Sequence, residues 1–177
     1  MPHSGKRAVR YAIVSLGHIA QVAMLPAFAH ARRNSRLTAL VSDDRSKLKE
    51  LARRYRVDFT FTYDDYDACL AQVDAVYIAL PNSMHAEYAI RAARAGVHVL
   101  CEKPMAVTSD ECRQMITACR RHRVRLMIAY RLHFEEINLR VVDLVRRGRI
   151  GEPKFFNSSF SMTVKRGDIR TRKDMGG

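Results

Sequence analysis

The sequence contains no run of apolar residues long enough to cross a bilayer, and its basic amino terminus is not followed by a signal-like segment. A membrane-spanning helix needs about 20 consecutive apolar residues, and a secretory signal needs an apolar stretch that ends in a small-residue cleavage site. We therefore expect a cytoplasmic protein. The chain also lacks repeats and low-complexity stretches, and its 177 residues with 47% hydrophobic content suit one sizeable core.

Cysteine is scarce, and its spacing does not indicate a site. The four cysteines are Cys69, Cys101, Cys112 and Cys119, and no two of them form a CxxC pair. Disulfides are rare in the cytoplasm, and zinc sites typically need closely spaced ligand pairs. We expect reduced thiols and no metal site.

Acidic residues are too few to balance the basic ones. The sequence has 18 aspartates and glutamates against 31 lysines and arginines, which gives a formal net charge of +13. Such a surface can bind nucleic acid through phosphates without a recognition motif. However, residues 120–125 and 146–149 lie at predicted helix ends, where cations oppose the helix dipole, and residues 165–173 lie in the tail. No interleaved aromatics, helix-turn-helix pattern or zinc spacing accompanies them, so a nucleic-acid binder is the weakest hypothesis and specific binding is not expected.

Strand-like runs alternate with amphipathic helical stretches along the chain. We predict strands near residues 9–15, 37–42, 59–61, 74–80, 97–101 and 124–129, with helices between them. This alternation predicts an α/β fold with a doubly wound parallel sheet. A longer helix is predicted over residues 133–147, and its stripe of Ile137, Val141, Leu144 and Val145 is expected to face the core.

A strand, a tight turn and a helix are predicted at the start of the chain. An apolar run ends at Ser15-Leu16-Gly17-His18-Ile19-Ala20, and a helix-like stretch follows to about Arg32. A dinucleotide-binding turn uses small residues so that the backbone can approach the pyrophosphate, whose charge is held by N–H groups at the helix start. Ala20 is an accepted variant of the third glycine, but Ser15 replaces the first, which normally makes the sharp turn. On its own the pattern is a weak signal.

Residues of both charges follow the second predicted strand. An acidic residue in the run Ser42-Asp43-Asp44 would hydrogen-bond the ribose hydroxyls of NAD, whereas Ser42, Arg45 and Lys47 could receive the 2′-phosphate of NADP. Ser42 or Asp43 would also serve as the N-cap of the next helix, and the two roles are compatible. These residues alone leave the choice of cofactor open.

Two further strands end in polar groups. Asn82 and His85 follow the run 74–80, and Glu102-Lys103-Pro104 follows the run 97–101. Ligands of open α/β sheets bind beyond the carboxyl ends of the strands, so Lys103 would face cofactor and substrate. A surface lysine at a strand end and a histidine that caps a helix are the alternative interpretations.

With these segments in this order, the chain resembles the amino-terminal part of the Gfo/Idh/MocA oxidoreductase family, and within it is most similar to the glucose-fructose oxidoreductases. The resemblance rests on residues 15–20, 25–28, 41–42, 77–86, 96–106 and 129–131. It implies a Rossmann domain that binds NAD or NADP, over residues 1–151, followed by an α/β domain that carries the sugar site and often an oligomer interface. Residues 152–177 would be the truncated start of that domain, with its first strand at 153–164.

The resemblance also implies roles for the matching residues. Lys103 would orient the substrate and assist proton transfer, and Glu102 and Pro104 would shape its turn. The other implied cofactor contacts are Ser15, Leu16, Gly17, His18 and Ile19 at the pyrophosphate, Ser42 and Lys47 at the 2′-phosphate, Tyr63, Leu80, Pro81, Asn82 and His85 along the track from adenine to nicotinamide, and Arg131 near the nicotinamide. The match of Ser42 and Lys47 favours NADP over NAD.

Two hypotheses of different classes follow. The first is an NADP-preferring or dual-specificity oxidoreductase that transfers hydride between the nicotinamide and a CH–OH or carbonyl carbon of a sugar or polyol. The second is a dinucleotide-binding module without turnover, or an inactive truncated product. It arises because the sequence stops before the family's helix that carries an aspartate and a histidine or tyrosine. The resemblance also allows a homo-oligomer through the sheet of the second domain.

Overall fold

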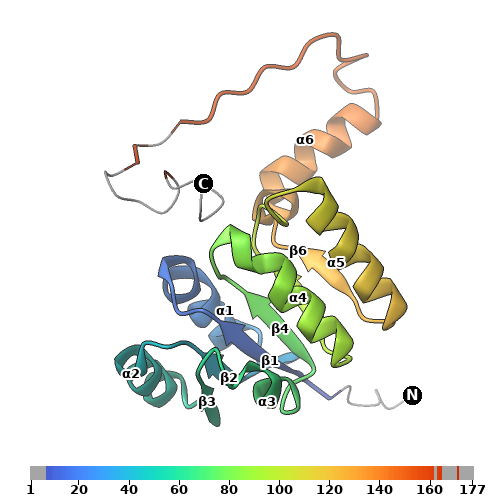
Figure 1. The fold of residues 1–177 in the computed structure, drawn as a ribbon. Helices are drawn as coiled ribbons and strands as arrows, with labels where there is room; N and C mark the ends of the chain where they lie inside the picture. Colours follow the sequence, from blue (N-terminus) through green and yellow to red (C-terminus); the bar gives the residue numbers. More distant parts are fainter. Residues whose placement is uncertain (1–6, 162, 165–170, 172–177) are drawn as a thin grey trace, which may run out of the picture.

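Six parallel strands form one sheet at the centre of the protein (Figure 1). The computed structural model describes residues 7–161, 163–164 and 171. The strands are β1 (Val9–Val14), β2 (Ser35–Val41), β3 (Phe59–Phe61), β4 (Ala75–Ile78), β5 (His98–Cys101) and β6 (Leu126–Ile128). Their order, β3-β2-β1-β4-β5-β6, is that of a doubly wound Rossmann sheet. The predicted fold class and the predicted strands are confirmed.

Helices connect the strands. They are η1 (Ala20–Met24), which continues into α1 (Leu25–His30), then α2 (Arg45–Tyr55), α3 (Tyr66–Leu70), η2 (Asn82–Met84), α4 (His85–Arg94), α5 (Ser109–Arg121), η3 (Arg131–Phe134) and α6 (Glu136–Arg146). Side-chain caps fix the start of two of them. Asp44 accepts a hydrogen bond from the Lys47 N–H at the start of α2, and Thr108 and Glu111 form a capping box at the start of α5.

Each face of the sheet has its own cluster of buried residues. The cluster under η1, α1 and α2 contains Ile13, Leu16, Ala20, Leu25, Leu40, Leu48, Leu51 and Tyr77. The larger cluster lies under α3, α4 and α5 and includes Val14, Tyr66, Val76, Tyr88 and Met115. Ile13 and Val14 belong to different clusters because successive side chains of a strand point to opposite faces. Helices α4 and α5 lie side by side on the second face (Figure 1).

The register of the sheet aligns the carboxyl ends of its strands. Val14 pairs with Val41 on one side and with Ile78 on the other, and the same row continues to Cys101 and Ile128. The residues that follow these five therefore leave the sheet at one common edge. Open α/β sheets bind their ligands at this edge.

The last predicted helix is formed as α6, but its start and the expected burial of its apolar stripe are wrong. Residues 131–134 form η3, so α6 begins only at Glu136, and the apolar stripe is not core: Ile137 is 78% exposed and Val141 is 52% exposed. Helix α6 packs mainly against η3 and extends beyond the sheet (Figure 1). An apolar stripe becomes core only where another surface meets it, and in the described part of the chain α6 has little such surface.

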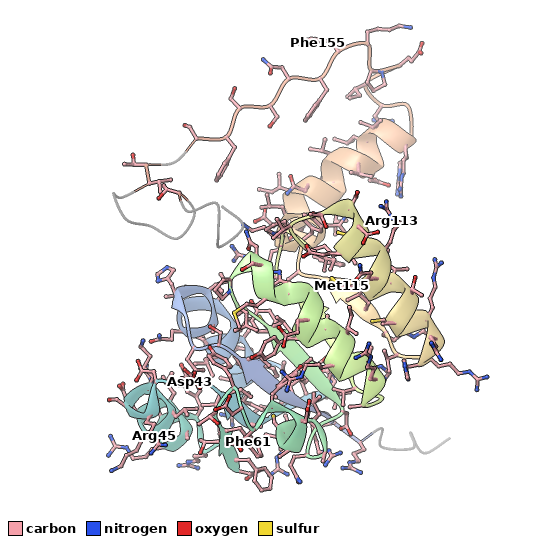
Figure 2. All side chains as sticks on the ribbon, viewed as in Figure 1. Asp43, Arg45, Phe61, Arg113, Met115 and Phe155 are labelled. Atoms are coloured by element: carbon pink, nitrogen blue, oxygen red, sulfur yellow. The ribbon has the colours of Figure 1, made fainter. Side chains whose placement is uncertain are left out.

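The strand expected at residues 153–164 is not formed. Its described residues, 153–161 and 163–164, have no regular secondary structure, and Phe155, Phe156 and Phe160 are exposed. Figure 2 shows Phe155 on an extended segment away from the sheet. A strand is stable only when a neighbour pairs with its backbone N–H and C=O groups, and none does so among the described residues.

The four cysteines are free, as the sequence predicted. Cys69, Cys101 and Cys119 are buried, and burial raises the pKa of the Cys69 and Cys101 thiols to about 12. These thiols therefore remain protonated and unreactive at neutral pH.

No helix among the described residues combines the length and the apolar character needed to span a membrane.

Candidate functional site

The turn after β1 is made by a serine where the motif usually has a glycine. Ser15 has a φ of 79°, in the left-handed region that glycine adopts most readily, and its N–H donates to the Val41 carbonyl at 2.9 Å. The conformation costs a serine about 1–2 kcal/mol. Ser15 thus makes the sharp turn that the sequence left in question. The chain is helical from His18 onward, so the N–H groups of a helix start lie at the carboxyl edge of the sheet.

Gly17 leaves open space at this turn. A Cβ atom added to Gly17 would meet only Ser15 Oγ, at 3.7 Å, which is an ordinary contact. Gly17 and His18 are exposed, and Gln21 Nε2 steadies the turn by donating to the Leu16 carbonyl at 2.7 Å. Internal packing therefore does not require glycine here. An open backbone beside free N–H groups fits a pyrophosphate.

Ser42, Asp44 and Lys47, which follow β2, are linked by a hydrogen bond and an ion pair. Ser42 is buried, and its Oγ accepts a hydrogen bond from the Asp44 N–H at 3.2 Å. Lys47 Nζ lies 2.8 Å from Asp44 Oδ2. The hydrogen bond between these side chains lowers the pKa of Asp44 and raises the pKa of Lys47. The predicted phosphate-binding lysine is therefore already engaged by a carboxylate.

Asp43 forms a hydrogen bond within the protein, whereas Arg45 is exposed. Asp43 accepts a hydrogen bond from the Tyr63 N–H at 3.0 Å, and the Tyr63 ring packs edge-on against Tyr88. Arg45 is exposed at the first position of α2, and Figure 2 labels both side chains in this region. Tyr63 thus contacts the predicted site through its backbone N–H, which binds Asp43, while its ring packs against Tyr88.

The loop after β4 presents only some of its predicted residues to the edge. Pro81 and Asn82 are partly exposed, whereas Leu80 is buried. His85 is fully buried, and its two ring nitrogens lie 2.9 Å from the carbonyl oxygens of Leu80 and Pro104. In this position the imidazole contacts protein backbone, so the predicted direct contact of His85 with a ligand has no geometric support here.

Lys103 lies on the loop after β5, and its side chain is exposed. Its backbone N–H donates to Glu102 Oε2 at 3.2 Å, and Glu102 Oε1 accepts a hydrogen bond of 2.5 Å from the Tyr77 hydroxyl. Burial and the bond to Glu102 raise the pKa of Tyr77 well above its ordinary value. The peptide bond between Lys103 and Pro104 is cis.

Arg131 follows β6 at the start of η3 and is exposed. It lies close enough to Tyr77 for its charge to act on that hydroxyl. A hollow of about 570 Å³ adjoins it, lined by Met127, Ile128, Tyr130, Leu132, His133 and Phe134. This lining is mostly apolar.

The structure thus brings most of the predicted residues to one edge and turns His85 inward. Tyr77 was not among the predicted site residues, although its hydroxyl donates a hydrogen bond to Glu102 from within the buried strand β4. A tyrosine in a predicted core strand could have indicated this contact, because a buried tyrosine hydroxyl usually finds a hydrogen-bond partner. Among the described residues, no three His, Cys, Asp or Glu side chains gather in a way that could hold a metal ion.

Comparison with known families gives one match over most of the chain. Residues 9–130 match the family model GFO_IDH_MocA, described as an oxidoreductase family with an NAD-binding Rossmann fold.

Two curated relatives illustrate the similarity. D-xylose 1-dehydrogenase (NADP(+)) of Haloarcula marismortui is 36% identical, over 88% of this chain and 44% of the relative. The dTDP-3,4-didehydro-2,6-dideoxy-alpha-D-glucose 3-reductase of Streptomyces violaceoruber is 34% identical, over 97% of this chain and 50% of the relative. The chain therefore spans about half the length of the curated relatives it matches.

Solved structures agree with this result. An aldose-aldose oxidoreductase from Caulobacter crescentus, complexed with glycerol, is 42% identical with a TM-score of 0.77, over 80% of this chain and 43% of the other. A 3-ketoreductase from Actinomadura kijaniata, in complex with TDP-benzene and NADP, is 32% identical with a TM-score of 0.87, over 97% of this chain and 52% of the other.

Proposed function

The chain belongs to the Gfo/Idh/MocA oxidoreductase family, and from this premise we propose that it binds NADP(H) along the carboxyl edge of its sheet and takes part in hydride exchange with a sugar or polyol. The nicotinamide supplies the hydride chemistry when it is bound. The tasks of this chain are to hold the dinucleotide, to orient the reacting carbon and to hold or move a proton.

The turn after β1 would hold the pyrophosphate. Ser15 turns the backbone, Gly17 lets a phosphate approach it, and the helix that starts at His18 offers N–H groups and the positive end of its dipole. Leu16 and Ile19 flank this contact.

A preference for NADP over NAD is supported by the charges that follow β2. Arg45 is exposed and can turn toward a 2′-phosphate, and Lys47 can share its charge between that phosphate and Asp44. Asp43, the residue that could bind the ribose hydroxyls of NAD, already accepts a hydrogen bond from the Tyr63 N–H. The names of two relatives point in the same direction, because one is an NADP(+) dehydrogenase and the other is bound to NADP.

Lys103 is the proposed catalytic residue. Its amine is exposed at the edge where the nicotinamide would lie, and a lysine there can hydrogen-bond the oxygen of the reacting carbon and assist its proton transfer. Asn82 and Arg131 would contact the nicotinamide end of the cofactor from the neighbouring loops. A sugar or polyol substrate is supported by the relatives, which are named for D-xylose and for a dTDP-linked sugar.

One observation carries the proposal: the Gly17 turn and the Lys103 loop leave the sheet from the same row of paired residues, Val14, Ile78 and Cys101. A dinucleotide that starts at the first of these loops can therefore extend toward the second.

The test is turnover of NADP⁺ with D-xylose as a probe in Lys103→Ala and in a control, Lys154→Ala. Lys154 is an exposed lysine paired with Glu152 beyond α6. We expect Lys103→Ala to lose about 100-fold or more in turnover, with the Kd for NADPH changed less than about threefold, and Lys154→Ala to match the wild type. NADPH binding without any turnover in the wild type would instead support the second hypothesis, a dinucleotide-binding module.

A further inference from the structure

The position of Lys103 is set by its two neighbours in the sequence. Lys103 is exposed and extends from a short loop, so its own side chain does little to fix where its amine lies. The residues before and after it, Glu102 and Pro104, are each bound by a buried side chain from another element. These two contacts come from opposite faces of the sheet.

The first contact comes from β4. Tyr77 is fully buried in the cluster under η1, α1 and α2, and its hydroxyl donates to Glu102 Oε1 at 2.5 Å. The other oxygen of the same carboxylate, Oε2, accepts from the Lys103 N–H at 3.2 Å. One carboxylate therefore connects a buried tyrosine to the backbone of the lysine. Because the pKa of Tyr77 is raised, its hydroxyl remains a donor across the whole neutral range.

The second contact comes from α4, on the other face. His85 Nδ1 lies 2.9 Å from the Pro104 carbonyl, and Nε2 lies 2.9 Å from the Leu80 carbonyl. A carbonyl oxygen can only accept, so a proton on Nδ1 lets the ring donate to Pro104. The buried imidazole lies between the loop after β4 and the loop after β5. Asn82 lies on the first loop and Lys103 on the second.

We infer that Tyr77 and His85 are positioning residues for Lys103, each holding one side of its loop. The inference rests on the proposed function, in which Lys103 meets the substrate. A displacement of about 1 Å in a reacting group can cost about 100-fold in rate. Two buried contacts on the residues that flank a catalytic lysine are therefore expected to act on turnover without touching the cofactor.

The decisive variant is Tyr77→Phe, which removes one oxygen atom and keeps the ring in the core. Tyr66→Phe is its matched control, because Tyr66 is also fully buried and its hydroxyl donates to a backbone carbonyl, that of Tyr88, at 3.2 Å. Both variants lose one buried hydrogen bond. Only Tyr77→Phe loses a contact to the Lys103 loop.

The position of Lys103 can be read without any substrate. The chain has seven lysines, so ¹³C-dimethylation of the amines gives a sparse NMR spectrum in which Lys103→Arg identifies the signal of Lys103. We expect this signal to shift or broaden in Tyr77→Phe and to stay in place in Tyr66→Phe. With NADP⁺ and D-xylose as probes, turnover should fall about 10-fold or more in Tyr77→Phe, with little change in KM or in the Kd for NADPH.

His85 is tested in the wild type, because a variant of a buried histidine can fail to fold. An ¹⁵N spectrum of the imidazole rings should show an N–H at Nδ1 of His85 that exchanges slowly with water, because this atom lies against the Pro104 carbonyl in a buried ring. A ring without a proton on Nδ1 would overturn the role of His85. A Lys103 signal that does not move in Tyr77→Phe would overturn the role of Tyr77. If the wild type does not bind NADPH, the proposed function fails, but the Lys103 signal still decides whether Tyr77 positions that lysine.

Discussion

Lys47 Nζ lies 2.8 Å from Asp44 Oδ2, and the backbone N–H of Lys47 donates to Asp44 Oδ1 at 3.0 Å. Asp44 is therefore both the N-cap of α2 and the partner of a lysine proposed to receive the 2′-phosphate. The phosphate has to compete with this carboxylate. Asp44→Asn keeps the cap, because asparagine and aspartate are equally good N-caps, and removes the competing charge.

We expect Asp44→Asn to lower the Kd for NADPH by up to about fivefold, because an exposed ion pair contributes little. The Kd for NADH should change little. Asp110→Asn is the control, because Asp110 forms a similar pair with Arg113 in the first turn of α5. Calorimetric titration of both variants with both cofactors measures the effect, and an unchanged ratio of the two Kd values in Asp44→Asn would contradict the role of Lys47.

Two glycines should respond in opposite ways to the same substitution. An added Cβ at Gly17 makes only an ordinary contact, whereas Gly96 has a φ of +76° that strains any other residue. We expect Gly17→Ala to raise the Kd of both cofactors at least about tenfold, without lowering the free energy of unfolding; that free energy should rise by up to about 1 kcal/mol, because alanine has less freedom than glycine in the unfolded chain. Gly96→Ala should lose about 1 kcal/mol of stability with normal cofactor binding. Urea unfolding and cofactor titration of the two variants separate these effects, and normal binding in Gly17→Ala would contradict the placement of the pyrophosphate.

Ser15→Gly should stabilise the protein. Removing a non-glycine residue from a φ of 79° gains about 1–2 kcal/mol, and the greater freedom of glycine in the unfolded chain offsets about half of this. We expect a net gain of about 0.5–1 kcal/mol in the free energy of unfolding. Urea unfolding at constant pH measures it. A loss of stability would show that the Ser15 side chain contributes more to the turn than its backbone strain costs.

The sheet was predictable because its strands are short apolar runs bounded by turn residues, and the four inner runs become its buried strands. The turn at Ser15 and the loop at Lys103 were predictable as positions at the carboxyl edge, since each directly follows a buried strand, and their roles in binding stay predictions. The exposure of the apolar stripe of α6 was not predictable, because periodicity shows that one face of a helix is apolar but does not show which surface covers that face. For His85, sequence cannot tell a histidine at a helix start that faces a ligand from one whose ring nitrogens lie against two carbonyls, 5 and 19 residues away.

Low pH should reduce the free energy of unfolding through the Arg10–Asp74 ion pair, which lies at the amino ends of the strands. Arg10 Nη2 lies 2.7 Å from Asp74 Oδ1, and this hydrogen bond lowers the pKa of Asp74. A carboxyl whose folded pKa is lowered contributes stability that is fully present above its ordinary pKa of 3.8 and is lost as the pH falls through the folded value.

Asp74→Asn should therefore be less stable than the wild type at neutral pH and should lose less stability between about pH 5 and pH 2. Asp58→Asn is the control, because Asp58 pairs with Arg36 in a more exposed position, with side chains 39% and 63% exposed. Thermal unfolding across the acid range compares the three proteins. Parallel curves for wild type and Asp74→Asn would rule out the assignment to Asp74.

We propose above that the edge formed by the Ser15 turn, the end of β2 and the Lys103 loop holds a dinucleotide. Calorimetric titration of the purified chain with NADPH and then with NADH measures this binding. We expect saturable binding of one cofactor per chain, tighter for NADPH by about fivefold or more because the 2′-phosphate meets Arg45 and Lys47. A folded protein that binds neither cofactor would contradict it.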